Sequence, residues 1–223
     1  MLRPMHCVVT AGPTYESLDE VRRLTNFSTG KLGTQLANFL AARGHQVTLL
    51  RGYYATHHES IQAQRVETFT TTDDLGARFR ALAGAGVDAI FHAAAVSDFK
   101  FGQIWERTSA GELIEARAGK VSTRSGTLVA ELVPTMKLLA SLRDWHPAAR
   151  LVGWKYEVDG RQADVLAKAE RQIAECRTDA CVANGKAYGL GFGLVRGPGQ
   201  CEHFREPQEL YAALERLAGT KRP

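Results

Sequence analysis

The chain has 223 residues, of which 44% are hydrophobic and 23% are charged, and its formal net charge is +4. A globular domain of this length buries enough apolar surface to fold without disulfides or a structural metal. The 28 basic and 24 acidic residues are too evenly balanced for a general nucleic-acid binder, but a mild positive charge suits a pocket for small anions.

The cysteines and the N-terminal segment indicate where the protein works. None of Cys7, Cys176, Cys181 and Cys201 belongs to a C-x-x-C pair or a zinc pattern. The N-terminus lacks the apolar stretch of a signal peptide, and no window approaches the roughly 18 apolar residues of a membrane span. We therefore expect a soluble, cytoplasmic protein with reduced thiols and no membrane partner.

Strand-like apolar runs alternate with helical spacing along most of the chain. Strands are expected at His6–Ala11, Gln46–Leu50, Val66–Phe69, Asp88–Ala95, Arg150–Trp154 and Asp179–Ala183. Helices are expected at Lys31–Arg43, closed by Gly44, after a cap at Thr72, Asp73 and Asp74, and at Arg161–Cys176. This alternation predicts a Rossmann-like, doubly wound parallel sheet in one nucleotide-binding α/β domain over residues 1–223, with ligands at the carboxyl ends of the strands.

The segment Phe99–Val133 departs from this alternation. It is polar, with short alternating stretches at Glu112–Ala116 and Thr127–Leu132. Long insertions in compact domains are usually functional or disordered. Residues 99–133 are therefore expected to form an inserted β-hairpin, acting as a flap over the site or as a dimerisation arm.

A Gly-rich segment between the first strand and the first helix carries the chemistry. The strand runs into Gly12, and the helix opens with Ser28, Thr29, Gly30 and, one turn on, Gly33. Glycines allow the backbone to approach a phosphate, and free N–H groups at a helix N-terminus attract anions. The segment is not a Walker A loop, because Leu32 follows the lysine, and an insertion after Gly12 spoils the G-x-G-x-x-G fingerprint.

Four blocks of sequence, in order, resemble the phosphopantothenate–cysteine ligase family of coenzyme A biosynthesis. The first is G-P-T followed by V-R-x-x-x-N-x-S-[ST]-G-K-x-G. The others are Ala93–Phe99, Leu151–Glu157 and Val182–Asn184. Because the chain starts at the ligase block, the resemblance suggests the free-standing form, without a flavin site.

The resemblance implies a ligase that uses ATP or CTP with Mg²⁺. The carboxylate of 4'-phosphopantothenate would attack the α-phosphate, giving an acyl-nucleotidylate and pyrophosphate. The amine of cysteine would then attack the acyl carbon, forming an amide and releasing the nucleoside monophosphate. Such chemistry requires that anions be held and neutralised.

Carried over residue by residue, the resemblance assigns roles to twelve positions. Nucleotide binding falls to Gly12, Ser28, Gly30, Gly33, Trp154 and Asn184. Contacts with the acid substrate fall to Asn26, Ala94, Ala95 and Asp98, with Asn26 also catalytic. Arg22 would reach the substrate phosphate across a homodimer interface, which implies shared sites, and Lys120 would be the catalytic lysine of a mobile flap.

Structural alternatives remain open at several of these positions. Asp98 could cap a turn, because aspartate favours such positions. Asn184 precedes glycine and could belong to a turn. Trp154 could be ordinary core, and Arg22 could be solvated.

The chain also departs from the family pattern, and this keeps other functions open. Val121, Ser122 and Thr123 stand where the family has further flap lysines, and the preceding segment is longer. Lys100 or Arg124 could substitute for the missing charge. A divergent or non-catalytic nucleotide-binding protein is one alternative. An NAD(P)-dependent short-chain-dehydrogenase-like enzyme is a weaker one, since none of the six tyrosines has lysine four positions on.

Overall fold

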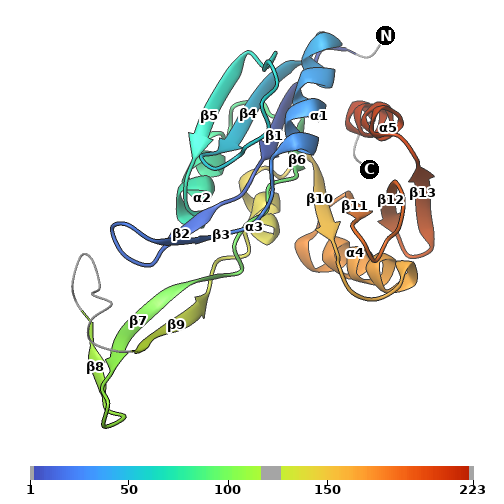
Figure 1. Cartoon of the computed structure of the whole chain (residues 1–223). Helices are drawn as coiled ribbons and strands as arrows, with labels where there is room; N and C mark the ends of the chain where they lie inside the picture. Colours follow the sequence, from blue (N-terminus) through green and yellow to red (C-terminus); the bar gives the residue numbers. More distant parts are fainter. Residues whose placement is uncertain (1–2, 117–126, 221–223) are drawn as a thin grey trace.

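The body of the protein is an eight-stranded sheet with helices on both faces (Figure 1). The computed structural model describes residues 3–116 and 127–220. The strands, in spatial order, are β13 (Gln200–Phe204), β12 (Phe192–Gly197), β11 (Ala180–Asn184), β10 (Arg150–Tyr156), β6 (Ala89–His92), β1 (His6–Ala11), β4 (Gln46–Gly52) and β5 (Arg65–Phe69). The six strands from β11 to β5 are parallel, which confirms the predicted sheet, whereas β12 and β13 add an antiparallel edge.

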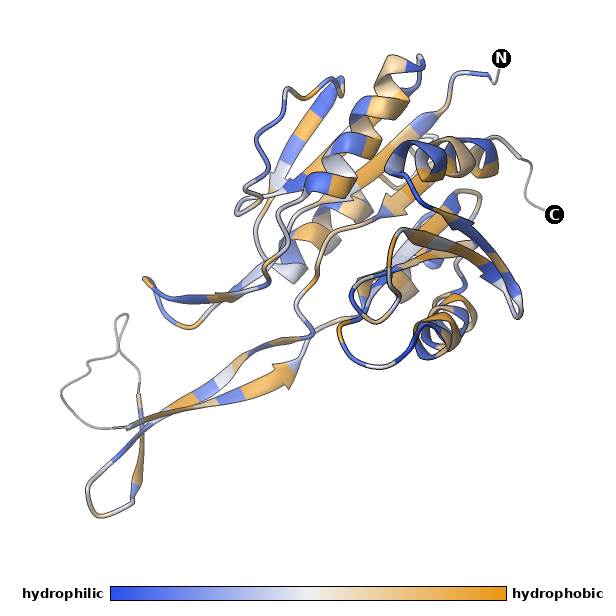
Figure 2. Cartoon of the chain, turned by 45° about the vertical axis from the view of Figure 1, so that its right-hand side comes forward, coloured by the Kyte–Doolittle hydropathy of each residue, from blue (hydrophilic) through white to orange (hydrophobic). Residues whose placement is uncertain are grey.

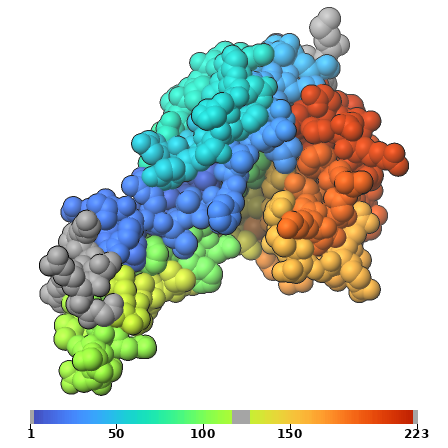
Figure 3. Space-filling view, viewed as in Figure 1, coloured from blue at the N-terminus to red at the C-terminus, as the bar shows by residue number. Residues whose placement is uncertain are grey.

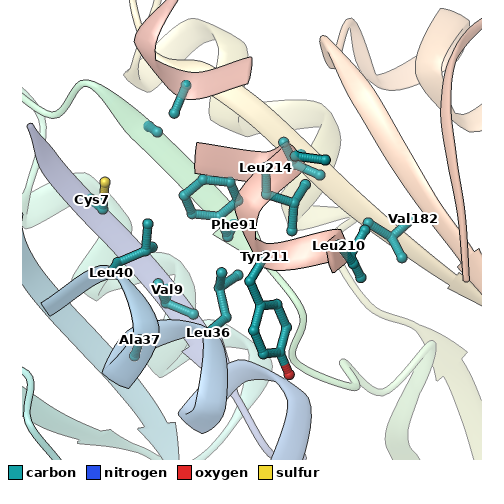
Figure 4. Packing of buried hydrophobic residues seen from close by; sticks show 14 of the residues in the cluster. Cys7, Val9, Leu36, Ala37, Leu40, Phe91, Val182, Leu210, Tyr211 and Leu214 are labelled. Carbon is teal, nitrogen blue, oxygen red and sulfur yellow. The ribbon is translucent and has the colours of Figure 1, made fainter. Parts of the chain in front are cut away.

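Two helices cover one face of the sheet and three cover the other. The first face carries α1 (Lys31–Ala42) and α5 (Pro207–Gly219), whose apolar side chains pack on β1, β6 and β11 (Figure 4). The second face carries α2 (Thr72–Ala81), α3 (Leu138–Trp145) and α4 (Gln162–Cys176). Figure 2 shows the hydrophobic strands between amphipathic helices, as expected when both faces of a parallel sheet are buried.

Local sequence signals explain where several helices begin and end. Gly44, with φ of 85°, follows the last turn of α1 in the left-handed conformation that glycine adopts without strain. The α2 helix is capped by Thr71, whose Oγ1 accepts the Asp74 N–H at 3.1 Å. The predicted cap at Thr72 was therefore wrong by one residue.

The strand expected at Asp88–Ala95 is shorter than predicted. β6 ends at His92, Ala93 and Ala94 leave the ladder, and Ala95 pairs again with Pro13 in an isolated parallel bridge. The Ala93 N–H folds back to Phe91 O at 3.2 Å, while the Ala95 N–H reaches Gly12 O at 3.0 Å. Small apolar residues fit a strand and a partly buried turn equally well, so the apolar pattern could not reveal this end.

Two excursions leave the carboxyl edge of the sheet (Figure 1). The first is a small hairpin of β2 (Tyr15–Ser17) and β3 (Arg23–Thr25). The second, the arm, is a three-stranded sheet of β7 (Phe99–Arg107), β8 (Leu113–Glu115) and β9 (Thr127–Pro134). β2 contacts β7, so hairpin and arm lie together where the chain leaves the body.

A buried cluster of charged side chains lies away from this edge. Asp179 holds two buried arginines, with Arg143 at 2.7 Å and Arg150 at 3.0 Å, and also accepts the Leu151 N–H. This cluster joins α3, β10 and the turn before β11.

Within residues 3–116 and 127–220, no helix is both long and apolar enough to cross a membrane.

Candidate functional site

The candidate site lies at the carboxyl ends of the parallel strands, between β1 and β6, where the order of strands along the chain reverses. Figure 3 shows a recess between the blue N-terminal half and the orange C-terminal half of the molecule. Open α/β sheets bind ligands at such a switch point. The geometry of this edge can be followed from one strand end to the next.

Gly12 and Gly30 meet directly at the N-terminus of α1. Both are in the left-handed conformation, with φ of 86° and 80°. A Cβ at Gly30 would lie 3.1 Å from the Gly12 nitrogen, and a Cβ at Gly12 would lie 2.6 Å from the Ala55 Cβ. Only glycine fits at both positions, so the backbone before α1 is closely packed on the end of β1.

Gly33 serves a different purpose from these two. It lies in the first turn of α1, where a Cβ would be 2.5 Å from Thr10 O and 2.7 Å from the Ala11 Cβ. The missing side chain therefore allows the start of α1 to lie directly on the end of β1.

Hydrogen bonds join the predicted substrate residues Asn26, Ala94 and Ala95 to the β1 strand end. Ala95 O accepts the Asn26 Nδ2–H at 3.2 Å and the Thr14 N–H at 3.1 Å. The Ala94 N–H donates to Thr10 Oγ1 at 3.0 Å. Three segments far apart in sequence thus meet at one strand edge, next to Gly12.

Trp154 and Asn184 lie on neighbouring strands β10 and β11. In the parallel register Trp154 is opposite Val182, and Asn184 is two residues further along, so both belong to the face covered by α1 and α5. The buried atoms Trp154 Nε1 and Asn184 Oδ1 have no hydrogen-bond partner among the described residues. Such atoms in native proteins usually have a partner, so a ligand group or water is expected there.

Of the remaining predicted residues, Arg22 and Asp98 lie apart from this centre. Arg22 is on the hairpin between β2 and β3, where its Nε donates to Asp19 Oδ2 at 3.0 Å. Asp98 is exposed at the start of the arm, and its carbonyl accepts the Thr135 N–H. Ser28 is partly buried just before Gly30. Lys120 falls outside the described residues, as does the suggested substitute Arg124.

The structure adds three polar groups that sequence reasoning missed. Arg51, at the end of β4, donates to Ala55 O at 2.7 Å and His57 O at 3.0 Å, and so holds the loop that packs on Gly12. Its position directly after a buried strand was a usable signal. His92 is buried against Phe79, and this burial lowers its pKa to about 4, so the ring is neutral.

The third group is a charged cluster at the end of β10. Glu157 pairs with Lys155 at 3.3 Å and with Lys168 at 2.5 Å, and its N–H donates to Asn184 O. Burial alone would raise the pKa of Glu157, but the two lysines lower it below its ordinary value. The cluster carries one net positive charge beside Asn184.

A glycine-opened helix at the switch point of a mostly parallel sheet defines a Rossmann-like α/β protein. More specifically, the chain belongs to the family described as the DNA/pantothenate metabolism flavoprotein C-terminal domain, whose model matches residues 2–197. This membership confirms the resemblance drawn from the sequence.

Individual relatives agree with the family match. The chain is 34% identical over 184 residues to the coenzyme A biosynthesis bifunctional protein CoaBC of Thermococcus kodakarensis, covering 82% of this chain and 42% of that protein. It therefore spans less than half the length of this relative.

Two solved structures share the fold. The DNA/pantothenate metabolism flavoprotein from Streptococcus pneumoniae has a TM-score of 0.80 at 23% identity, covering 95% of this chain and 97% of that chain. A Cab2 variant in complex with phosphopantothenate-cysteine has a TM-score of 0.69 at 19% identity, covering 96% of this chain and 86% of that chain.

Proposed function

We propose that this chain is a phosphopantothenate–cysteine ligase, which joins 4'-phosphopantothenate to cysteine through an acyl-nucleotidylate. The observation that carries the proposal is the convergence of Gly12, Asn26 and Ala95 at the N-terminus of α1. This arrangement would bind a phosphate of the nucleotide beside polar groups that can bind the acid substrate. Family membership supports the same assignment.

The proposed nucleotide is CTP or ATP. Its phosphates would lie at Ser28, Gly30 and Gly33, and its nucleoside at Trp154 and Asn184, whose unpartnered buried atoms support a bound polar group there. Lys155 and Lys168 supply cations near Asn184. They would compensate for the further flap lysines of the family pattern that this chain lacks. Lys120 is the proposed catalytic lysine of the flap.

Mg²⁺ would enter with the nucleotide. Among the described residues, no group of three His, Cys, Asp or Glu side chains is placed to hold a metal ion. Mg²⁺ is commonly bound through substrate phosphates and only one or two carboxylates, so this donor set fits a metal carried by the phosphates. Bound there, Mg²⁺ would neutralise charge on the transferring group.

Within the chain, Asn26 would position the acyl group, and the strand-end backbone at Ala94 and Ala95 would hold the acid. Asp98, at the start of the arm, would contact the same substrate from the far side. All four cysteines are free, which supports the proposed location in a reducing cytoplasm.

We further propose a homodimer with shared sites, in which the arm and hairpin contact the second copy. Three apolar side chains near the hairpin support this: Val21, Leu24 and Phe27 are 54%, 41% and 104% exposed. Arg22, whose Nε donates to Asp19 Oδ2 in its own chain, would reach a phosphate bound by the partner.

The test of the proposed activity is product formation. The protein, incubated with 4'-phosphopantothenate, cysteine, Mg²⁺ and either CTP or ATP, is expected to yield the amide and the nucleoside monophosphate, followed by mass spectrometry. Omission of any one substrate should abolish the amide. Absence of product with both nucleotides would refute the ligase assignment and favour a non-catalytic nucleotide-binding role.

The shared site has its own test. Asn26→Asp is expected to block amide formation without unfolding the chain, and Arg22→Ala should also inactivate. If sites are shared, mixing the two inactive variants should restore partial activity, because one site in the mixed dimer is then intact. Absence of any recovery after subunit exchange would contradict this geometry.

A further inference from the structure

The turn after β6, Ala93–Ala95, here called the alanine turn, has a one-sided hydrogen-bonding surface. Its three N–H groups donate to Phe91 O, Thr10 Oγ1 and Gly12 O. The carbonyls of Ala93 and Ala94 accept no hydrogen bond from any described residue, and all three alanines are partly exposed. Toward a ligand, the alanine turn therefore presents acceptors only.

Two buried side chains, Thr10 and His92, engage the Ala94 N–H and so keep it from a ligand. Thr10 is completely buried, and its Oγ1 accepts the Ala94 N–H at 3.0 Å while lying 2.9 Å from His92 Nδ1. His92 is neutral, so Nδ1 can accept the hydroxyl proton, and Thr10 Oγ1 then donates to the imidazole while it accepts the Ala94 N–H. Phe79 packs edge-on against the imidazole and keeps it in place.

We propose that Thr10 and His92 are positioning residues. By engaging the Ala94 N–H, they leave the alanine turn with hydrogen-bond acceptors only, so that it binds hydrogen-bond donors of the acid substrate and not its anionic ends. This inference rests on the proposed function. 4'-Phosphopantothenate carries two such donors, a secondary hydroxyl and an amide N–H. Its phosphate and carboxylate would be repelled by bare carbonyls and would bind elsewhere.

The same sheet contains a matched control for this pair. Thr48 is also buried, and its Oγ1 lies 3.0 Å from His6 Nε2, but the other ring nitrogen of His6 contacts Ala85 O in the loop before β6 and not the alanine turn. Thr48→Val therefore removes a comparable threonine–histidine contact nearer the opposite edge of the sheet. It separates general loss of stability from an effect on substrate binding.

The first experiment compares KM values. Thr10→Val and His92→Phe keep the shape but remove the polar partner, which leaves the Ala94 N–H or the Thr10 hydroxyl unpaired. We expect KM for 4'-phosphopantothenate to rise about 10-fold in both, with KM for the nucleotide changed less than about 2-fold. Thr10→Ser and His92→Asn, which restore the hydroxyl and the acceptor, should recover most of this loss, and Thr48→Val should leave both KM values unaffected.

The second experiment begins with the wild-type chain, so its first result does not depend on the folding of a variant. Calorimetric binding is measured for 4'-phosphopantothenate, its analogue without the secondary hydroxyl, and its analogue with an ester oxygen in place of the amide N–H. At least one analogue should bind about 10-fold more weakly than the parent. In Thr10→Val this penalty should shrink, because the displaced turn no longer reads the donor.

The outcomes separate the inference from the proposed function. Equal binding of all three acids, or a Thr10→Val chain that matches Thr10→Ser in both KM values, would overturn the inference while leaving the ligase intact. Parent acid that binds but is never converted to the amide would refute the ligase alone. Failure of the parent acid to bind at all would overturn both.

Discussion

Substitution of Gly33 by alanine tests the close packing that places the start of α1 on the end of β1. In an open helix position this change would stabilise the chain, because alanine has the better helix propensity by about 1 kcal/mol. Here the added Cβ would lie 2.5 Å from Thr10 O and 3.0 Å from the Ala11 Cα, so backbone must move. A loss of stability in Gly33→Ala would therefore indicate close packing of α1 on β1, and a gain would indicate an open helix position.

The expected magnitude follows from these opposing effects. Overpacking costs roughly 1–3 kcal/mol, and contact with backbone instead of a flexible side chain places Gly33→Ala at the upper end of this range. Net of helix propensity, we expect about 2 kcal/mol of lost stability. In a domain of this size that lowers the midpoint of thermal unfolding by roughly 4–8 °C.

The assay is urea and thermal unfolding, with Gly197→Ala as the control. Gly197 has no atom within 4 Å of a built Cβ and no positive φ, so its replacement should change stability by less than about 0.5 kcal/mol. Nucleotide affinity should fall in Gly33→Ala only, because the N-terminus of α1 is displaced. A Gly33→Ala chain as stable as wild type would refute the packing described here.

Three further predictions concern other parts of the fold. Arg51→Met should raise KM for the nucleotide about 3- to 10-fold in steady-state assays, since Ala55 then loses its anchor beside the glycines, and Arg51→Lys should lie between. Asp179→Ala should cost roughly 3–5 kcal/mol in urea unfolding, because two buried arginines lose their partner, and a loss under about 1 kcal/mol would contradict that reading. The pKa of His92 is about 4 in the folded chain, below its ordinary 6.5. Its contribution to stability is therefore full above pH 6.5 and is lost as the pH falls toward 4. In His92→Asn, the free energy of unfolding should depend less on pH across that window.

The sequence was most informative where local signals agree with tertiary structure. β1 and α1 have strong patterns, buried β-branched residues in one and helical spacing closed by Gly44 in the other, and both lie where predicted. The start of α5 also had a local signal, because Glu206 and Glu209 form a capping box and Pro207, between them, is the first helical residue. It was not among the predicted elements.

Other features depend on contacts between distant segments. β2 and β3 have only three residues each, and the hairpin is held by Glu16, whose Oε1 accepts the Thr72 N–H from the start of α2 at 3.0 Å. Nothing local in the sequence marks that contact. The β12 and β13 edge is likewise decided by pairing with β11, not by its own pattern.

The sequence named candidate residues for the site, but it could not reveal how they are connected. Gly12 was assigned to the nucleotide and Asn26 and Ala95 to the acid, and hydrogen bonds to Ala95 bring all three to one strand edge. The contribution of Thr10 and His92 appears only once β1 and β6 are neighbours, since their side chains are 82 positions apart. Arg22 and Lys120 keep their roles as predictions.

The most direct test of the central claim is pyrophosphate release in the absence of cysteine. With enzyme in stoichiometric amount, 4'-phosphopantothenate, Mg²⁺ and the preferred nucleotide should release one pyrophosphate per site and then stop, because the acyl-nucleotidylate is held. Added cysteine should restart release and convert the intermediate to the amide. Release of inorganic phosphate instead, or no pyrophosphate with either CTP or ATP, would contradict the proposed chemistry.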